Sequence, residues 1–256
     1  MRLLNASINR FNGIEVEPAS LPGTTEQFDT DLRHSLSVWR EEGRGVIWLP
    51  IPVQQSCLIP VAVEAGFAFH HTGDDYLMLT CALRSPSHVP GHATHYIGAG
   101  GVVVNAAAEL LVVVERYQRN PAQIPRYKLP GGALYPGEHL ATAVVRETAE
   151  ETGIQTEFQS VVCMRHWHGY RFGKSDIYIV CRLHPLTHEI RRQEEEIAEC
   201  RWMPLDEYLE HEHVSAFNQH VVRVALDGQG LALECVPGYD DAEQFEILTA
   251  GAGLQA

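Results

Sequence analysis

The chain has 256 residues, enough for one large domain or two of modest size, and its composition is that of an ordinary globular protein. Its formal net charge at pH 7 is −14. This charge argues against a general nucleic-acid or anionic-membrane binder, because both need basic patches to neutralise phosphates. We therefore expect no nucleic-acid partner and no membrane partner.

The first part of the chain predicts a separate, smaller α/β unit. A helix opens at Gly23-Thr24-Thr25, presents one apolar face and ends at Gly43. The expected order of elements is β-α-β-α-β-β. The remaining elements are a strand over 5–17, a strand over 45–49, a helix over 54–65 and a hairpin of 67–71 and 76–83. The turn-rich stretch 85–91 is the candidate linker, which gives an amino-terminal domain over 1–92.

The rest of the chain predicts a mixed β-sheet between helices, an α/β (α+β) fold class. A valine-rich hairpin precedes a helix that carries several acidic residues, and further strands and a closing helix come after it. The elements are a hairpin of 96–105 and 109–116, strands over 158–167, 177–183 and 199–203, and a helix over 205–226. We assign 93–227 to this second domain and 228–256 to a carboxy-terminal extension.

The cysteines and histidines carry weaker signals. The six cysteines are widely spaced with no Cys-x-x-Cys pair, which is typical of buried free thiols in a reducing compartment. Residues 1–10 lack the apolar run of a signal peptide, and no stretch approaches the length of a membrane span. We therefore expect a cytoplasmic protein. His166-x-His168 lacks companion metal ligands at sensible spacing, and we interpret His70-His71 as core or turn histidines.

Three carboxylates of the predicted acidic helix fall on one face. Glu147, Glu150 and Glu151 stand at i, i+3 and i+4, so their side chains converge beside an arginine. Three like charges this close repel strongly unless a divalent cation lies among them. The spacing therefore predicts a cation site for phosphate chemistry. The alternative, a solvated acidic surface helix, explains neither the Pro-Gly-Gly turn at 130–132 nor Gly153 as a helix stop.

The same segment resembles the signature of the Nudix hydrolases, Gly-x5-Glu-x7-Arg-Glu-U-x-Glu-Glu-x-Gly-U, in which U is a bulky aliphatic residue. Every fixed position is matched, by Gly132, Glu138, Arg146, Glu147, Glu150, Glu151 and Gly153. One aliphatic position holds Thr148 instead, on the apolar stripe of the helix. Its hydroxyl is predicted to donate to the Val144 carbonyl one turn earlier, which leaves the acidic face intact.

The resemblance implies the Nudix α/β/α sandwich and a hydrolase of phosphoric anhydride bonds that uses Mg²⁺ or Mn²⁺. Magnesium prefers octahedral oxygen coordination and keeps several waters, so a few carboxylates on one helix suffice to hold it. We expect Glu147, Glu150 and Glu151 to be the ligands. By resemblance, the carbonyl of Gly131 adds a ligand, and Glu138 joins as a more distant or water-mediated one.

The family pattern also implies catalytic roles. Arg146 is expected to orient Glu147, and Glu147 is a candidate general base. Some Nudix enzymes assign that role to a glutamate further along the chain, which also adds a metal ligand. Here the acidic loop before Trp202 contains it, with Glu196 as first choice and Glu195 as second. Without the motif, this charge run would be interpreted as a solvated loop.

Further stretches resemble one branch of the family, in which an additional amino-terminal domain precedes the Nudix domain. They include Trp39-Arg40-x-Glu42-Gly43, Gly66-Phe67-x-Phe69-His70-His71 and Phe172-Gly173-Lys174-Ser175-Asp176. This branch contains the plant ADP-ribose/NADH pyrophosphatases and the animal antisense basic fibroblast growth factor proteins. The resemblance implies ADP-ribose or NADH as substrate, cleaved between the two phosphates to give AMP and a second phosphate ester.

Two alternatives remain open for the function. Tyr170 stands where many ADP-ribose hydrolases carry a proline, and a tyrosine near this position is found in many dinucleoside polyphosphate hydrolases. The other alternative is a non-catalytic nucleotide-binding regulator, although the chain retains every glutamate of the motif. The candidate substrate contacts, chosen by their sequence neighbourhood, are Tyr127, Lys128, Arg165 and Lys174. The sequence leaves open whether the protein forms a homodimer.

Overall fold

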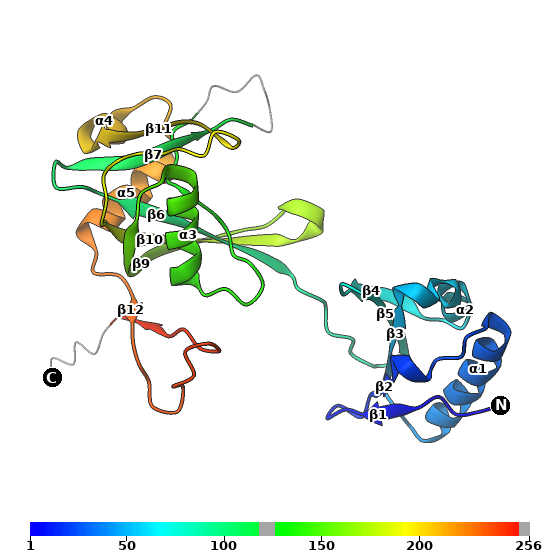
Figure 1. Cartoon of the computed structure of the whole chain (residues 1–256). Helices are drawn as coiled ribbons and strands as arrows, with labels where there is room; N and C mark the ends of the chain where they lie inside the picture. Colours follow the sequence, from blue (N-terminus) through cyan, green and yellow to red (C-terminus); the bar gives the residue numbers. More distant parts are fainter. Residues whose placement is uncertain (118–125, 251–256) are drawn as a thin grey trace. The chain divides into compact units, whose positions relative to one another are not determined.

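The computed structural model describes residues 1–117 and 126–250. Contacts between Cα atoms divide the chain into two compact units, Met1–Thr94 and His95–Ala256, and each is described by itself (Figure 1). The domain limits inferred from the sequence, 1–92, 93–227 and 228–256, remain predictions about which segments fold independently.

The amino-terminal unit is a five-stranded sheet covered on one face by helices. Strand β2 runs parallel to β3, and the other neighbouring pairs are antiparallel. The strands, in spatial order, are β1 (Ala6–Ile8), β2 (Ile14–Val16), β3 (Val46–Pro52), β5 (Tyr76–Ala82) and β4 (Ala68–Thr72). Along β3, Ile47, Leu49 and Ile51 are fully buried against the helices, so the alternating Trp48 lies on the opposite face.

Helix α1 (Thr25–Glu41) begins and ends where the sequence predicts. The Thr24 hydroxyl accepts a hydrogen bond from the Gln27 amide (3.3 Å), and Gly43 adopts a left-handed φ of 70° just after the helix. The inward face of α1 buries Phe28, Leu32 and other residues against the sheet. Local capping signals therefore fix the limits of this helix.

Two predictions for the amino-terminal unit are wrong in detail. Residues 5–17 form two antiparallel strands rather than one, because the Asn9 side chain accepts hydrogen bonds from the amides of Phe11 (3.0 Å) and Gly13 (2.9 Å) and so closes a turn. The predicted helix over 54–65 is a 3₁₀ segment (Val53–Leu58) followed by α2 (Ile59–Glu64). Pro60 suits the first turn of α2, where its missing N–H costs no hydrogen bond.

The carboxy-terminal unit is a sandwich in which strands separate helix α3 from helices α4 and α5. Strands β6 and β10 pair in parallel at the centre of a four-stranded sheet, and β7 pairs with β11. The strands are β6 (His95–Val103), β7 (Glu109–Glu115), β8 (Gly131–Ala133), β9 (Thr156–Trp167), β10 (Ser175–Pro185), β11 (Ile197–Pro204), β12 (Ala232–Leu233) and β13 (Leu248–Thr249). The helices are α3 (Leu140–Thr152), α4 (Leu205–Glu210) and α5 (Ala216–Asp227).

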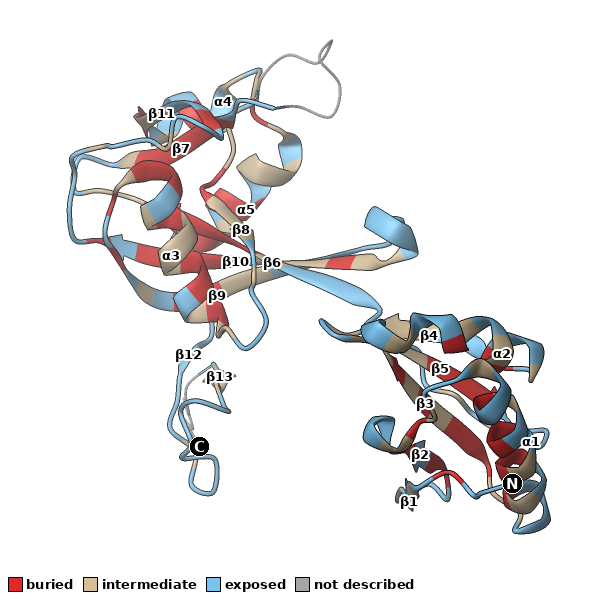
Figure 2. Ribbon diagram, turned by 45° about the vertical axis from the view of Figure 1, so that its right-hand side comes forward, coloured by how far each residue is buried: buried red, intermediate tan, exposed pale blue. Residues whose placement is uncertain are grey.

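Two hydrophobic clusters hold this sandwich together. Val102 on β6 packs toward α4 and α5, whereas its neighbour Val103 packs toward α3. Figure 2 shows the buried residues of this unit gathered in the strands and on the facing sides of the helices. The α/β/α arrangement expected from the sequence is confirmed.

Two predictions for this unit are also wrong in detail. The expected hairpin of 96–105 and 109–116 does not form, because β6 and β7 join different sheets and share only a bridge between Val104 and Leu110. Both strands are apolar on two faces, and such a pattern does not encode which distant strand each one pairs with. The closing helix is broken into α4 and α5, because the Ser215 hydroxyl accepts from the Asn218 amide (3.1 Å) and starts a new helix.

Among the described residues, no helix combines the length and the apolar character needed to cross a bilayer.

Candidate active site

Helix α3 is fixed by its apolar side and by both of its ends. Leu140, Ala143 and Val144 are buried in the sandwich. The Thr148 hydroxyl donates to the Val144 carbonyl at 2.7 Å, as predicted, so the threonine fits this apolar stripe. The helix ends at Gly153, whose φ is 75°. The acidic side of α3 is thereby turned away from the core.

Arg146 gathers three of the predicted glutamates. Its guanidinium makes a bidentate contact with Glu138 (2.7 and 2.8 Å) and single contacts with Glu147 (2.9 Å) and Glu150 (3.0 Å). The ring of Tyr135 lies beneath it, 4.0 Å from the guanidinium carbon. The hydrogen bonds to Glu138 are the main cause that raises the pKa of Arg146, and they lower the pKa of Glu138.

Glu138 therefore braces the arginine rather than pointing away from it. Both of its oxygens accept from Arg146, and one also accepts from the Tyr135 amide (3.0 Å). A carboxylate with these partners holds Arg146 rigidly, and Arg146 in turn positions Glu147. The contact between Arg146 and Glu147 is the one that the family pattern implies. Its catalytic meaning stays a prediction.

Glu151 is the buried member of the acidic face. Its side chain is 8% exposed, against 50% for Glu150. One oxygen accepts from the Gly131 amide (2.8 Å), and the other lies 3.6 Å from the Lys128 ammonium, which is also 2.7 Å from Glu115. Burial raises the pKa of Glu151 to about 6, although Lys128 and Gly131 oppose the shift. Glu151 is thus mainly ionised at neutral pH.

Two glycines of strand β8 allow close approaches, Gly132 by the Glu147 carboxylate and Gly131 by the backbone of β6. A Cβ atom added to Gly132 would lie 2.5 Å from the Glu147 carboxylate carbon, and one added to Gly131 would lie 2.1 Å from the Ala99 carbonyl oxygen. The φ of Gly131 is 146°, which other residues rarely adopt. The Glu147 and Glu151 carboxylates therefore both reach the backbone of this glycine turn. A set of carboxylate oxygens beside this half-buried backbone fits cations that prefer oxygen ligands, such as Mg²⁺ and Mn²⁺.

The acidic loop before β11 runs past the carboxyl end of α3. The amide of Arg191 donates to the Thr152 carbonyl (2.8 Å), and that of Gln193 donates to the Glu151 carbonyl (3.2 Å). Glu196 is exposed, and its backbone carbonyl accepts from the Arg116 amide (2.7 Å). The loop is therefore anchored to the acidic helix through its backbone. Roles for the Glu195 and Glu196 carboxylates remain predictions.

The structure places the four predicted substrate contacts in different surroundings. Lys128 joins the acidic face through Glu151. Tyr127 instead donates to Glu199 (2.9 Å) beneath Arg201, away from Lys128. Arg165 is bound to Asp176 (2.6 Å). Lys174 lies in the turn between β9 and β10, on a hairpin that projects from the sandwich (Figure 1). Only Lys128 thus contacts a glutamate of the motif among the described interactions.

Sequence reasoning missed three residues around the site. Glu115 ends a valine run and offered no signal for its partner Lys128. Tyr178 fills the space beside Gly100, where an added Cβ would lie 1.7 Å from its hydroxyl oxygen, and burial raises its pKa to about 12. Glu246 accepts from the amides of Leu140 (3.0 Å) and Ala141 (2.9 Å) at the start of α3. Pairing across the fold, not local pattern, creates all three contacts.

An α/β/α sandwich whose glycine turn leads into an acidic helix clamped by arginine defines a protein of the Nudix class. Two family models match the chain, the Nudix hydrolase domain over residues 4–83 and the NUDIX domain over residues 94–223. The chain belongs to the Nudix hydrolase family.

Named relatives support this membership. The chain is 41% identical over 210 residues to Nudix hydrolase 8 of Arabidopsis thaliana, an alignment that covers 81% of this chain and 57% of the plant protein. It is 38% identical over 232 residues to human Nucleoside diphosphate-linked moiety X motif 6, covering 88% of this chain and 72% of the human protein. The chain thus spans little more than half of the plant relative. Among solved structures, a NUDIX hydrolase from Nitrosomonas europaea has a TM-score of 0.47 at 19% identity, over 57% of this chain and 99% of that one.

Proposed function

We propose that the protein is a Mg²⁺- or Mn²⁺-dependent pyrophosphohydrolase that cleaves the diphosphate linkage of a nucleoside diphosphate derivative. ADP-ribose and NADH are the first candidates, and the products are AMP and a second phosphate ester. The observation that carries the proposal is the convergence of Glu147 and Glu151 on the turn at Gly131-Gly132, with Arg146 bracing Glu147.

The glutamates of α3 hold the cation in this proposal. Glu147, Glu150 and Glu151 supply carboxylate oxygens, and the Gly131 carbonyl adds one from the backbone. When bound, Mg²⁺ neutralises phosphoryl oxygens and lowers the pKa of a coordinated water. Arg146 keeps Glu147 in a fixed position through its contact at 2.9 Å. Because Glu138 occupies two further nitrogens of Arg146, the guanidinium has little freedom to leave that position.

Proton transfer from the attacking water needs a carboxylate that is ionised at neutral pH. Glu147 accepts one hydrogen bond from Arg146, which holds its carboxylate in place beside Gly132. Glu196 is exposed at the end of the anchored loop, with its neighbour Ile197 paired to Glu115. We propose Glu147 as the general base and retain Glu196 as the second candidate for the base and as an additional metal ligand.

The substrate is proposed from the named relatives and from the sequence likeness of 172–176. The name of the human relative refers to nucleoside diphosphate-linked moieties. The second candidate class is dinucleoside polyphosphates, which Tyr170 suggested. In the structure Tyr170 packs edge-on against Tyr96 of β6 and Trp167 of β9, each at 5.6 Å between ring centroids, so aromatic packing already accounts for this residue. A nucleotide-binding regulator is the third candidate.

One experiment separates these candidates. Nucleotide and phosphate release is measured for ADP-ribose, NADH, diadenosine polyphosphates and coenzyme A with added Mg²⁺. We expect ADP-ribose or NADH to give the highest kcat/KM. Diadenosine polyphosphates turning over at least tenfold better, about 1.4 kcal/mol in transition-state binding, would favour the second class. Nucleotide binding without turnover of any substrate would favour the regulator.

A further inference from the structure

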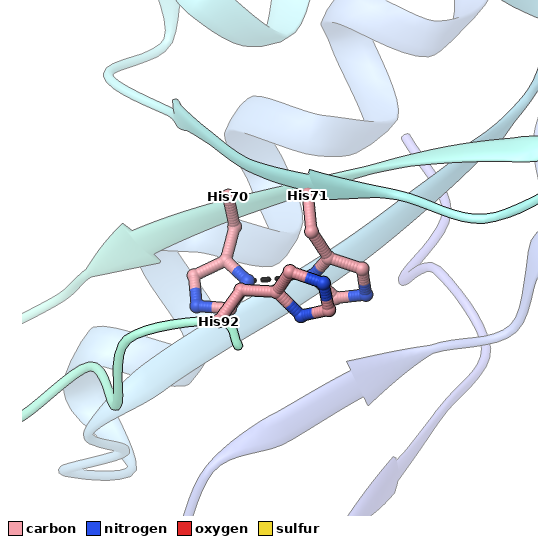
Figure 3. Close-up of side chains that lie close together, drawn as sticks. All are labelled: His70, His71 and His92. Carbon is pink, nitrogen blue, oxygen red and sulfur yellow. Dashed lines mark hydrogen bonds between the residues drawn. The ribbon is translucent and has the colours of Figure 1, made fainter. Parts of the chain in front are cut away.

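Two consecutive histidines on edge strand β4 point to the same side of the amino-terminal sheet. In a regular strand neighbouring side chains alternate between faces. The pairing of β4 with β5 shifts register between Phe69 and His71, so that His70 is an extra residue in the ladder. Such a bulge re-aims a side chain. Figure 3 shows the rings of His70 and His71 on one side of the strand, close to each other.

A third histidine from another segment completes the cluster. His92 follows β5 in the chain, and its ring stacks on that of His71 with centroids 4.3 Å apart. One potential ligand atom from each of His70, His71 and His92 lies within 4.8 Å of the others. Trp48 contacts His70 at 4.9 Å between ring centroids, which places the cluster on the sheet face opposite the helices. The position is remote in sequence from the Nudix motif.

The hydrogen bond of the outer ring nitrogen of His70 leaves the inner nitrogen of that ring available for a metal. The His70 Nε2 lies 2.7 Å from the Pro90 carbonyl oxygen, which can only accept, so Nε2 carries the proton and Nδ1 carries a lone pair. The His71 Nε2 lies 3.3 Å from the Tyr76 hydroxyl. Metal-binding histidines usually have such a partner on the nitrogen that does not bind the metal.

The spacing of the inner nitrogens is compatible with a shared ion. The two Nδ1 atoms of His70 and His71 are 2.6 Å apart. A tetrahedral zinc site with bonds of about 2.0–2.1 Å separates its ligand nitrogens by about 3.3 Å. Binding one ion requires the two Nδ1 atoms to move slightly apart and the His92 ring to turn out of its parallel stack on His71. A hydrogen bond between the two Nδ1 atoms is the competing explanation, and a zinc titration distinguishes the two.

We propose that His70, His71 and His92 form a site for a divalent transition-metal ion of the Zn²⁺ class, separate from the site for Mg²⁺ on α3. Neutral imidazole suits such ions, whereas Mg²⁺ prefers oxygen ligands. Three histidines leave a fourth position for water or another donor. The ion would link edge strand β4 to the segment around His92, which follows β5, and would thereby hold that segment against the sheet.

The test is a titration of the full chain with Zn²⁺ alone, by calorimetry, after chelation and buffer exchange and in the presence of excess Mg²⁺. Cobalt(II) replaces zinc in a parallel titration, because its visible absorption reports nitrogen coordination. We expect one equivalent to bind. His71→Gln and His92→Gln should each weaken the affinity at least about tenfold. His34→Gln, which removes a histidine from α1 on the other face of the sheet, should bind as the parent does.

Two outcomes would overturn the site. One is parental zinc affinity in both His71→Gln and His92→Gln, with far-ultraviolet circular dichroism verifying that each variant is folded. His92 lies on an exposed segment, so its variant keeps the test valid should His71→Gln unfold. The other is a loss of binding that follows Glu147→Gln or His166→Gln instead, which would place the ion on α3 or on the separate contact of His166 with His95.

Discussion

At the scale of single residues, Glu150 differs from Glu151 on the same acidic face of α3, because its side chain is far more exposed. Glu150 is half exposed and bound only to Arg146 at 3.0 Å among the motif residues. We expect Glu150→Gln to weaken Mg²⁺ binding and to lower kcat/KM by roughly 10² or more, because metal-bound water supplies the nucleophile. The stability of the metal-free fold should change by no more than about 0.5 kcal/mol, as for other exposed ion pairs.

The matched control for this variant is Glu194→Gln, at the far end of the exposed acidic loop. It removes the same charge and should cost much less activity. Turnover and denaturant unfolding of both variants are compared at limiting Mg²⁺. Near-parental turnover of Glu150→Gln under these conditions would show that this face of α3 does not hold the catalytic metal.

Gly132 gives a second test at this scale. Its Cβ would lie 2.5 Å from the Glu147 carboxylate carbon, so Gly132→Ala should push the carboxylate out of place without disturbing the backbone. We expect activity to fall about 10²-fold while the protein stays folded, since even a small displacement of a metal ligand is costly. Gly23→Ala, where nothing lies within 4 Å of the added atom, is the control. Parental kcat in Gly132→Ala would contradict the position assigned to Glu147.

The pH dependence of metal binding depends on Glu151. Its pKa is raised to about 6, so the proton is held more tightly than in the unfolded chain and competes with the cation as the pH falls through 6. Mg²⁺ affinity should therefore be constant above about pH 7 and decline by up to about tenfold per unit below 6. Calorimetric titrations between pH 7.5 and 5 measure this. An unchanged affinity at pH 5 would remove Glu151 from the ligand set.

At the scale of elements, the sequence predicted correctly those features of a helix that depend on residues within or next to it. The limits of α1, the acidic face of α3 and its stop at Gly153 depend on caps and on spacing within one helix, and the sequence shows both directly. The separation of β6 and β7, by contrast, depends on partners distant in the chain. The break between α4 and α5 was predictable in principle, because Ser215 is a strong capping residue.

That break provides a test at the element scale. Ser215→Ala removes the acceptor for the Asn218 amide (3.1 Å) and should lower the free energy of unfolding by about 1 kcal/mol. Ser37→Ala is the control, because Ser37 is an exposed hydroxyl within α1 rather than a cap. Equal unfolding midpoints for Ser215→Ala and the parent in denaturant would show that the cap contributes nothing.

At the scale of the whole molecule, the catalytic cation and the fold are expected to be separable. The apolar side of α3 is buried, and Arg146 and Lys128 already lie among the carboxylates, so the helix does not need the metal to form. Exhaustive chelation should abolish hydrolysis and leave the far-ultraviolet circular dichroism spectrum unchanged. Full turnover after chelation would exclude the metal mechanism.

The sequence predicted the overall architecture more completely than it predicted the contacts within the site. The family resemblance implied the sandwich, and the glutamates of α3 were visible because they lie in one continuous segment with the rest of the motif. The partners of Lys128 and the packing of Tyr178 on Gly100 were not predictable in this way, since strands far apart in the chain meet there. Substrate contacts belong to this second kind, which is why their assignment remains a proposal.

The carboxylate of Glu246 has a consequence for the order of events during synthesis. This carboxylate accepts a hydrogen bond from the amide of Leu140, which lies 106 positions earlier in the chain. The ribosome therefore releases the acidic helix long before it makes the side chain that caps it. A nascent chain passes through an interval in which Glu246 does not yet accept from these two amides of α3, and any chain truncated before Glu246 lacks this cap.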